Sequence, residues 1–132
     1  MANIAVGTRR EVKIPVTGEI TTSFLGHDDA RVLSTPHMIG LMEKTCRDAI
    51  LGSLDPGYDT VGTHVDVYHL AAAPLGSNVT ITSEVIAVDN RRVRFRVEAA
   101  TDKQKVGEGT HERTIINVRK FAARQAEKKA NQ

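Results

Sequence analysis

Hydrophobic residues alternate with polar ones in five separate stretches of the chain, a period of two that is typical of β-strands with one buried face. In the first stretch, residues 10–16, the side chains of Val12, Ile14 and Val16 share one side. Pro15 has no N–H to donate to a neighbouring strand, so we expect this strand at the edge of a sheet. Residues 17–33 show no such period, and we expect a surface loop there.

A single helix is predicted over residues 36–52. Its apolar positions lie three and four residues apart, as on one buried helix face: Met38, Leu41, Met42, Thr45, Ala49 and Ile50. Thr35 is the expected N-cap because its hydroxyl can accept from a free backbone N–H, and Pro36 suits the first turn. Gly52 is the expected stop.

Four further alternating stretches follow the helix. The residues expected on the buried faces of the first three are Val61, Thr63, Val65, Val67 and His69, then Val79, Ile81, Ser83, Val85 and Ala87, then Val93, Phe95, Val97 and Ala99. The fourth stretch runs over residues 106–118. Asp89-Asn90, between the second and third stretches, predicts a tight hairpin.

One strand, one long helix and four antiparallel strands make an α+β fold class, in which an antiparallel sheet of about five strands covers one helix. One helix can fill only one face of such a sheet, so we expect further burial through a two-fold homodimer. The domain is predicted to occupy residues 1–118. Residues 119–132 form a basic tail that has five Lys or Arg, one Glu and no apolar stripe, and it is predicted to fray or to form a solvated helix.

Composition narrows the function classes. The chain has 132 residues, 26% of them charged and 40% hydrophobic, as in one folded globular domain. With two Tyr, three Phe, no Trp and a net charge of +2 that is concentrated in the tail, nucleic-acid binding is not expected. No apolar run approaches a membrane span. The N-terminus has no signal-peptide pattern and Cys46 has no second cysteine to pair with, so a cytoplasmic location is expected.

Three stretches together resemble one known family. They read STPHMIGLMEKTC over residues 34–46, VGTHVDVYHLAAAPLG over residues 61–76 and GTHER over residues 109–113. In this order they are similar to the fluoroacetyl-CoA thioesterase group of hotdog-fold proteins. The resemblance implies the hotdog fold, hydrolysis of an acyl-CoA substrate, and neither metal nor cofactor.

The resemblance also implies a set of site residues. The family's catalytic threonine, glutamate and histidine fall on Thr35, Glu43 and His69. A glycine and an arginine at the acyl-binding end fall on Gly62 and Arg113. All five residue types are retained in this chain.

The lid over the acyl pocket departs from the family pattern. The fluoroacetyl-specific member covers this pocket with bulky aromatic side chains, whereas Phe24 is the only aromatic residue between residues 17 and 33. We therefore expect ordinary short acyl-CoA thioesters to be substrates, without a preference for the fluorinated one.

Without the family, Glu43 and His69 each allow two interpretations. Glu43 lies beside the apolar helix face, where burial would raise its pKa as a general base requires; alternatively it pairs with Arg47 on the helix surface. His69 is expected to point toward the helix, either as a site residue that pairs with Glu43 or as a satisfied core histidine.

Other chemistries have weaker support. His64 and Asp66 share a strand face with Gly62 and Tyr68, but a zinc site needs three or four ligands, so no metal site is expected. Cys46 has no local feature that would lower the pKa of its thiol, and we expect it to pack in the core. Nucleotide-binding glycine patterns are absent from the sequence.

The sequence leaves two alternatives open, one for the function and one for the arrangement of the site. A non-catalytic hotdog module that binds acyl-CoA or serves as a dimeric scaffold is the alternative to the enzyme. Within the enzyme hypothesis, Thr35 and Glu43 lie eight residues apart on one helix, about 12 Å at 1.5 Å per residue. Either Thr35 folds back over the helix, or the two residues act together from different subunits.

Overall fold

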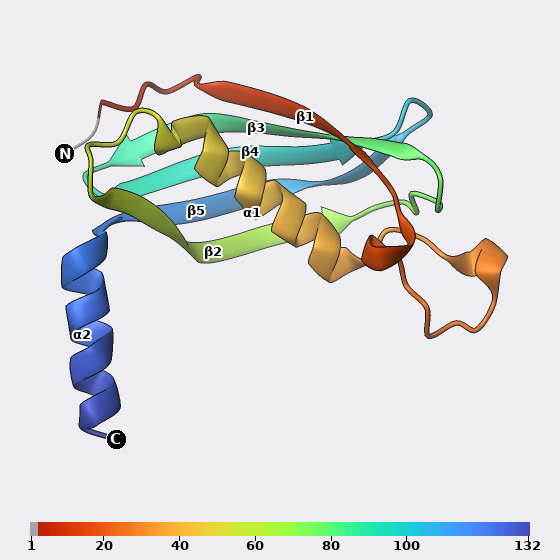
Figure 1. Ribbon diagram of the computed structural model, residues 1–132. Coiled ribbons are helices and arrows are strands. Elements are labelled where there is room, and N and C mark those ends of the chain that lie inside the picture. The colour runs from red at the N-terminus through yellow and green to blue at the C-terminus, as the bar shows by residue number, and fades with distance from the viewer. Residues whose placement is uncertain (1–2) are drawn as a thin grey trace.

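The computed structural model describes residues 3–132, which form one antiparallel sheet with a long helix across one face (Figure 1). The strands are β1 (Arg9–Pro15), β2 (Tyr58–His69), β3 (Asn78–Asp89), β4 (Arg92–Ala100) and β5 (Lys105–Asn117), and the helices are α1 (Thr35–Leu51) and α2 (Val118–Ala130). The strand order is β1-β3-β4-β5-β2, so β1 and β2 form the two edges. The five-strand α+β hotdog prediction is confirmed, as is the edge position of β1.

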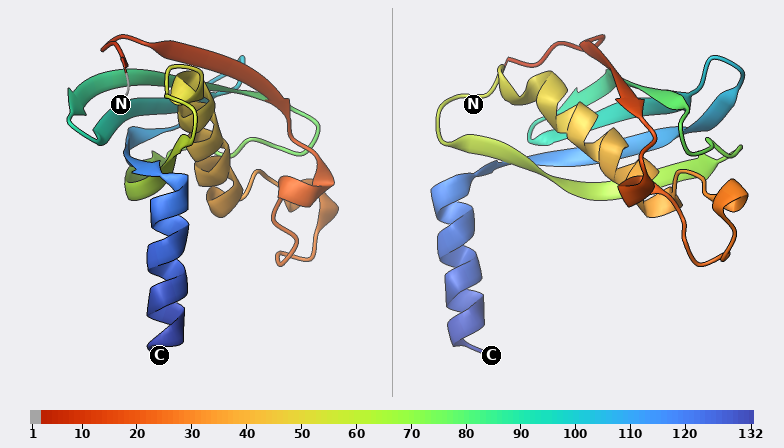
Figure 2. Two further views of the ribbon diagram at one scale, coloured as in Figure 1. Left: turned by 60° about the vertical axis from the view of Figure 1, so that its left-hand side comes forward. Right: turned by 45° about the vertical axis from the view of Figure 1, so that its right-hand side comes forward.

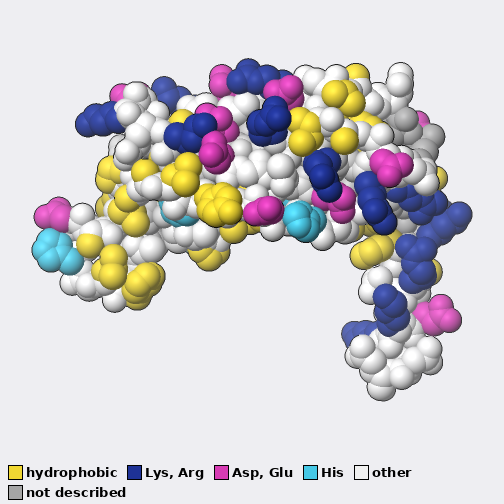
Figure 3. Space-filling view, turned by 180° about the vertical axis from the view of Figure 1, so that it is seen from behind, with side chains coloured by type: hydrophobic (Ala, Val, Ile, Leu, Met, Phe, Trp, Pro, Cys, Tyr) yellow, Lys and Arg dark blue, Asp and Glu magenta, His cyan; other side chains and the backbone are white. Residues whose placement is uncertain are grey.

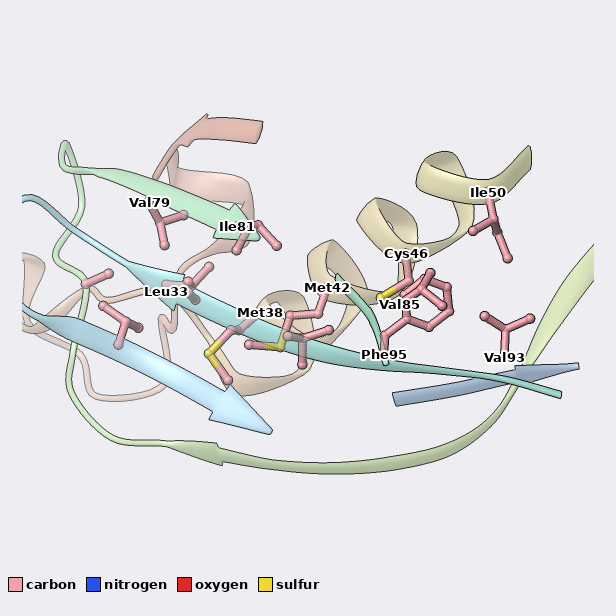
Figure 4. Close-up of a cluster of buried hydrophobic side chains, with 14 of the residues drawn as sticks. Leu33, Met38, Met42, Cys46, Ile50, Val79, Ile81, Val85, Val93 and Phe95 are labelled. Carbon is pink, nitrogen blue, oxygen red and sulfur yellow. The ribbon is translucent and has the colours of Figure 1, made fainter. Parts of the chain in front are cut away.

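The core lies between α1 and the sheet (Figure 4). Met38, Met42, Cys46 and Ile50 of the helix are buried against alternating residues of the strands: Val79, Ile81, Val85, Val93, Phe95, Val97 and Ala99. The periods of two and of three to four therefore identify the buried faces of β4 and α1 correctly, and that of β3 as far as Val85. Ala87, also predicted on the buried face, is exposed, because the pairing of β3 with β4 shifts register between Val85 and Ala87. The β3–β4 hairpin is also as predicted, with Asn90 at a φ of 56° in its turn.

The start of α1 corrects the expected N-cap. Ser34, not Thr35, caps the helix: its hydroxyl accepts from the backbone N–H of His37. Thr35 is the first helical residue, and Leu51 is the last. With the capping position taken by Ser34, the Thr35 hydroxyl is free to bond elsewhere.

A β-bulge in β2 corrects the expected face of that strand. The pairing with β5 shifts register between Gly62 and His64. Gly62 pairs with Arg113 before the shift and Val65 pairs with His111 after it, so Gly62 and Val65 lie on the helix side of the sheet. Val61 and Thr63, predicted on that side, are therefore not on it, because the extra residue in a bulge reverses the alternation.

The tail forms α2, which leaves the sheet and projects away from it in every view (Figures 1 and 2). Asn117 caps this helix, and no residue of it is buried. Its Lys and Arg side chains gather on the projection (Figure 3). Of the two predictions for the tail, the solvated helix is the correct one. That residues 119–132 are a unit separate from a domain of residues 1–118 remains a prediction. No helix among residues 3–132 has the length and apolarity to cross a membrane.

Candidate active site

Thr35 and His69 meet at one end of α1. Thr35 Oγ1 lies 2.7 Å from His69 Nδ1. Thr35 opens the helix and His69 is the last residue of β2, so the pair joins the start of one element to the end of another. Since Ser34 performs the capping, the threonine hydroxyl can donate its proton to the imidazole.

The second nitrogen of this imidazole, Nε2, is buried and has no hydrogen-bond partner among residues 3–132. Burial lowers the pKa of His69, and the backbone of Ala71 opposes that shift. A lowered pKa keeps the imidazole neutral at pH 7, which is the state that can accept a proton from Thr35.

An open cavity of about 400 Å³ adjoins the pair. Its lining is Thr22, Val32, Leu33, Thr35, His69, Leu70, Ala71 and Ala72. The walls are mostly apolar, with Thr35 and His69 among the few polar groups. This composition suits a small acyl group that must be held next to a nucleophile. A larger hollow of about 720 Å³, beside Lys13 and Lys103, contains none of the five predicted site residues.

Glu43, Gly62 and Arg113 form a second cluster farther along α1. Glu43 Oε1 lies 3.9 Å from Arg113 Nη1 and 3.8 Å from His111 Nε2. A Cβ on Gly62 would come within 2.5 Å of the same Glu43 oxygen. The absence of a side chain at Gly62 therefore gives the Glu43 carboxylate its position over the sheet.

Arg113 is the buried member of this cluster. Its Nε donates to Thr60 Oγ1 at 2.7 Å, and its Nη2 donates to the Thr60 carbonyl at 3.0 Å. Burial lowers the pKa of Arg113, and the Glu43 carboxylate opposes this. The arrangement holds one cation under one carboxylate at the surface of the sheet.

The expected pair of Glu43 with His69 is not formed. Thr35 is the partner of His69, while the nearest ionisable partners of Glu43 are His111 and Arg113. Glu43 is also less buried than expected, with 40% of its side chain exposed. The structure thus separates the five predicted residues into two groups, Thr35 with His69 and Glu43 with Gly62 and Arg113.

The surface alternative for Glu43 is wrong as well. Arg47 binds Asp59 of β2 through two hydrogen bonds, of 2.8 and 2.6 Å, rather than Glu43 four residues before it. Arg47 pairs with Asp59 because β2 places Asp59 beside α1. Glu43 is left to face Arg113.

The predicted absence of a metal site at His64 and Asp66 and the predicted packing of Cys46 can be compared with the structure. His64 and Asp66 are exposed, and the bulge places Gly62 on the other face of the strand. No three His, Cys, Asp or Glu side chains converge as a metal-binding group within residues 3–132. Cys46 packs in the core as expected, where burial raises the pKa of its thiol to about 12.

His111 was not predicted as a site residue, although it contacts the second cluster. It alternates with Arg113 and Ile115 along β5, and all three are buried. This period of two is visible in the sequence and could have placed His111 beside Arg113.

Comparison with known proteins identifies the family. The family model described as fluoroacetyl-CoA-specific thioesterase matches residues 16–119. The chain belongs to this family. A fluoroacetyl-CoA thioesterase from Streptantibioticus cattleyicolor is 42% identical over 97 residues, which cover 74% of this chain and 70% of that protein. The resemblance of the three stretches is confirmed, and the chain is a homologue of a thioester hydrolase.

Solved structures of this family and of the wider thioesterase superfamily agree with the fold. One fluoroacetyl-CoA thioesterase is 36% identical and superposes with a TM-score of 0.86 over 96% of this chain and 98% of its own. A variant of that enzyme in complex with acetyl-CoA is 34% identical, with a TM-score of 0.87 over 95% and 98% of the two chains. A thioesterase superfamily member from Thermus thermophilus is 31% identical, with a TM-score of 0.89 over 99% and 97%.

Proposed function

We propose that this protein hydrolyses short-chain acyl-CoA thioesters to the free acid and coenzyme A, without a metal. The 2.7 Å contact between Thr35 Oγ1 and His69 Nδ1 at the edge of a small apolar cavity is the observation that supports this most directly. A hydroxyl that can donate to a neutral imidazole is a group ready for acyl transfer. A relative in complex with acetyl-CoA makes a short acyl-CoA the natural substrate class.

His69 acts as the base in the reaction. Its Nδ1 takes the proton either from Thr35, whose oxygen then attacks the thioester carbon, or from a water that Thr35 orients. The carbon–sulfur bond breaks, and the proton passes from His69 to the leaving thiolate of coenzyme A. In the first route a water then hydrolyses the acyl-threonine ester. In the first turn of α1, Pro36 has no N–H and the His37 N–H donates to Ser34 Oγ, so the Thr35 N–H, together with the helix dipole, is the group that would stabilise the oxyanion.

Glu43 reaches this chemistry from a second subunit. Within one chain, Thr35 and Glu43 lie about 12 Å apart along the helix axis, too far for both to contact one thioester carbon. The outer edge of β2 pairs with no strand in the described part of the chain, and long open edges in natural proteins are commonly covered. A two-fold homodimer across this edge would bring Glu43, Gly62 and Arg113 of one subunit to Thr35 and His69 of the other.

Selectivity follows from the loop over the cavity. Phe24 is its only aromatic residue between residues 17 and 33, and 83% of Phe24 is exposed. No aromatic cluster closes over the acyl group in this region. Acetyl-CoA and other short acyl-CoA thioesters should therefore be hydrolysed at rates comparable to that of fluoroacetyl-CoA.

A thiol-release assay with acyl-CoA thioesters of increasing chain length, fluoroacetyl-CoA included, tests the proposal. Thr35→Ala and Glu43→Gln should each abolish turnover of short substrates, while Glu127→Gln on the exposed α2 helix serves as the matched control. Acyl-CoA binding without thiol release by the unaltered protein would instead establish the non-catalytic module. A strong preference for fluoroacetyl-CoA over acetyl-CoA would contradict the selectivity argument.

A further inference from the structure

His111 of β5 connects the β2 bulge to Arg113. The His111 side chain is only 1% exposed, and its ring stacks on that of Phe95 with centroids 6.4 Å apart. Nδ1 lies 2.8 Å from the backbone carbonyl oxygen of His64, and Nε2 lies 3.1 Å from Arg113 Nη1. Both ring nitrogens are therefore in hydrogen bonds, one at the bulge and one at the candidate active site.

The two partners fix the protonation state of this ring. A carbonyl oxygen can only accept a hydrogen bond, so Nδ1 must bear a hydrogen and donate it. A guanidinium can only donate, so Nε2 must present its lone pair to Arg113. Only the neutral imidazole with its hydrogen on Nδ1 satisfies both conditions.

His111 also completes the set of contacts that orients Arg113. Thr60 accepts from Nε and Nη2 of the guanidinium, and His111 accepts from Nη1. With all three nitrogens engaged, the planar group cannot rotate without losing a hydrogen bond. Nη1 is also the atom that lies nearest to the Glu43 carboxylate, at 3.9 Å.

We propose that His111 is a positioning residue, which holds Arg113 in the orientation that faces Glu43 and transmits the geometry of the Gly62–His64 bulge to that site. The inference rests on the proposed function where it concerns turnover, because Arg113 and Glu43 belong to the candidate active site. The hydrogen-bond arrangement itself does not depend on the reaction.

Protonation of His111 would disrupt this arrangement. The charged groups on the ring's side of the sheet are Arg113 on β5 and Glu43 on α1, while the titratable side chain of His64 on β2 is exposed on the opposite face. Burial is the main cause that lowers the pKa of His111, and Arg113 lowers it further, against the His64 carbonyl and Glu43. An added hydrogen on Nε2 would point at an Arg113 N–H, with two positive charges side by side. The neutral ring is thus the form that keeps Arg113 in place.

The first experiment reads the imidazole directly. Nitrogen-15 NMR of the full chain at pH 7.5 should show a neutral ring with hydrogen on Nδ1, assigned by the signal that is lost in His111→Gln. The opposite tautomer, or an imidazolium at this pH, would overturn the proposal. This measurement needs no substrate, so its result stands whether or not the chain proves to be a thioesterase.

The second experiment separates the two hydrogen bonds. His111→Gln can place an oxygen near the Nε2 position and keep an acceptor for Arg113, whereas His111→Asn reaches only the Nδ1 position, and His111→Leu fills the space without polar atoms. The Gln variant should keep kcat/KM within about threefold, while the Asn and Leu variants should lose about tenfold or more, mainly through KM, because the hydrogen bond that holds a charged group is lost.

Two outcomes of this comparison would overturn the proposal. One is a folded Leu variant with unchanged KM, which would make His111 a packing residue only. The other is a folded Gln variant as impaired as the Leu variant. If none of the variants folds, the tautomer of the unaltered protein decides. If the unaltered chain releases no thiol, the proposed function fails, and the NMR result still decides the role of His111 toward Arg113.

Discussion

Thr35 Oγ1 lies 2.7 Å from His69 Nδ1, whereas Glu43, on the same helix as Thr35, faces Arg113 instead. One helix thus carries parts of two polar clusters, a hydroxyl–imidazole pair at its start and a carboxylate–guanidinium pair two turns later. Within residues 3–132, the first cluster has no carboxylate, and the second has no hydroxyl–imidazole pair. This division is the reason to expect that two subunits build each site together.

The pH dependence of turnover follows from the state of His69. The imidazole must be neutral to accept a proton, and burial lowers the pKa of His69 in the folded protein. The acid limb of kcat/KM should therefore have an apparent pKa below the ordinary histidine value of about 6.5. Rates of thiol release with acetyl-CoA between pH 4.5 and pH 8 measure it. An acid limb centred above the ordinary value would contradict a neutral buried base.

Replacement of Gly62 by alanine should move Glu43 out of place. The added Cβ would come 2.5 Å from Glu43 Oε1 and 3.1 Å from His111 Cε1. Glu43 is a flexible side chain that can swing away, so we expect little change in Tm and a loss of about tenfold or more in kcat.

Gly40→Ala provides the matched control for Gly62→Ala. Gly40 lies on α1 with nothing within 4 Å of its added Cβ, and alanine in a helix interior stabilises by about 0.5–1 kcal/mol. Activity should be unchanged in this variant. Equal kcat values for Gly62→Ala and the unaltered protein would show that Glu43 does not need its present position.

Arg113→Ala should impair substrate capture more than proton transfer. The substitution leaves two buried Thr60 oxygens and the buried His111 Nε2 without the Arg113 donors, which costs about 1–3 kcal/mol of stability. Steady-state kinetics should show KM rising more than kcat falls, and a thermal melt should show a lowered Tm. A folded variant with both kinetic constants unchanged would remove Arg113 from the site.

Deletion of residues 121–132 should leave the domain nearly intact. The α2 helix has no buried residue, and its basic side chains project from the sheet. We expect Tm and kcat/KM close to those of the full chain, compared in the same buffer. A large fall in Tm would show that α2 packs against another part of the molecule or against a second subunit.

The sequence predicted the elements well where local periodicity decides them. Val93, Phe95, Val97 and Ala99 of β4 alternate without interruption, and all of them are buried. The same rule failed in β2 because the bulge after Gly62 depends on how this strand pairs with β5, a long-range property that no local pattern records.

For the site, too, the local sequence identified the residues, whereas their contacts depend on the fold. The motifs singled out Thr35, Glu43 and His69, but not which of them meet. Helix spacing showed that Thr35 and Glu43 lie far apart. The partners of Glu43 come from β5, some seventy residues later in the chain, and only the fold brings them under the helix.

A subunit-mixing experiment tests the composite site most directly. Thr35→Ala and Glu43→Ala chains, each inactive alone, are mixed one to one under conditions of demonstrated subunit exchange, so that about half of the dimers are hybrids. In each hybrid one site pairs an intact Thr35 with an intact Glu43, so about a quarter of all sites should recover thiol release. If one chain supplied both residues, every site would retain a lesion, and full exchange without recovery of activity would contradict the shared site.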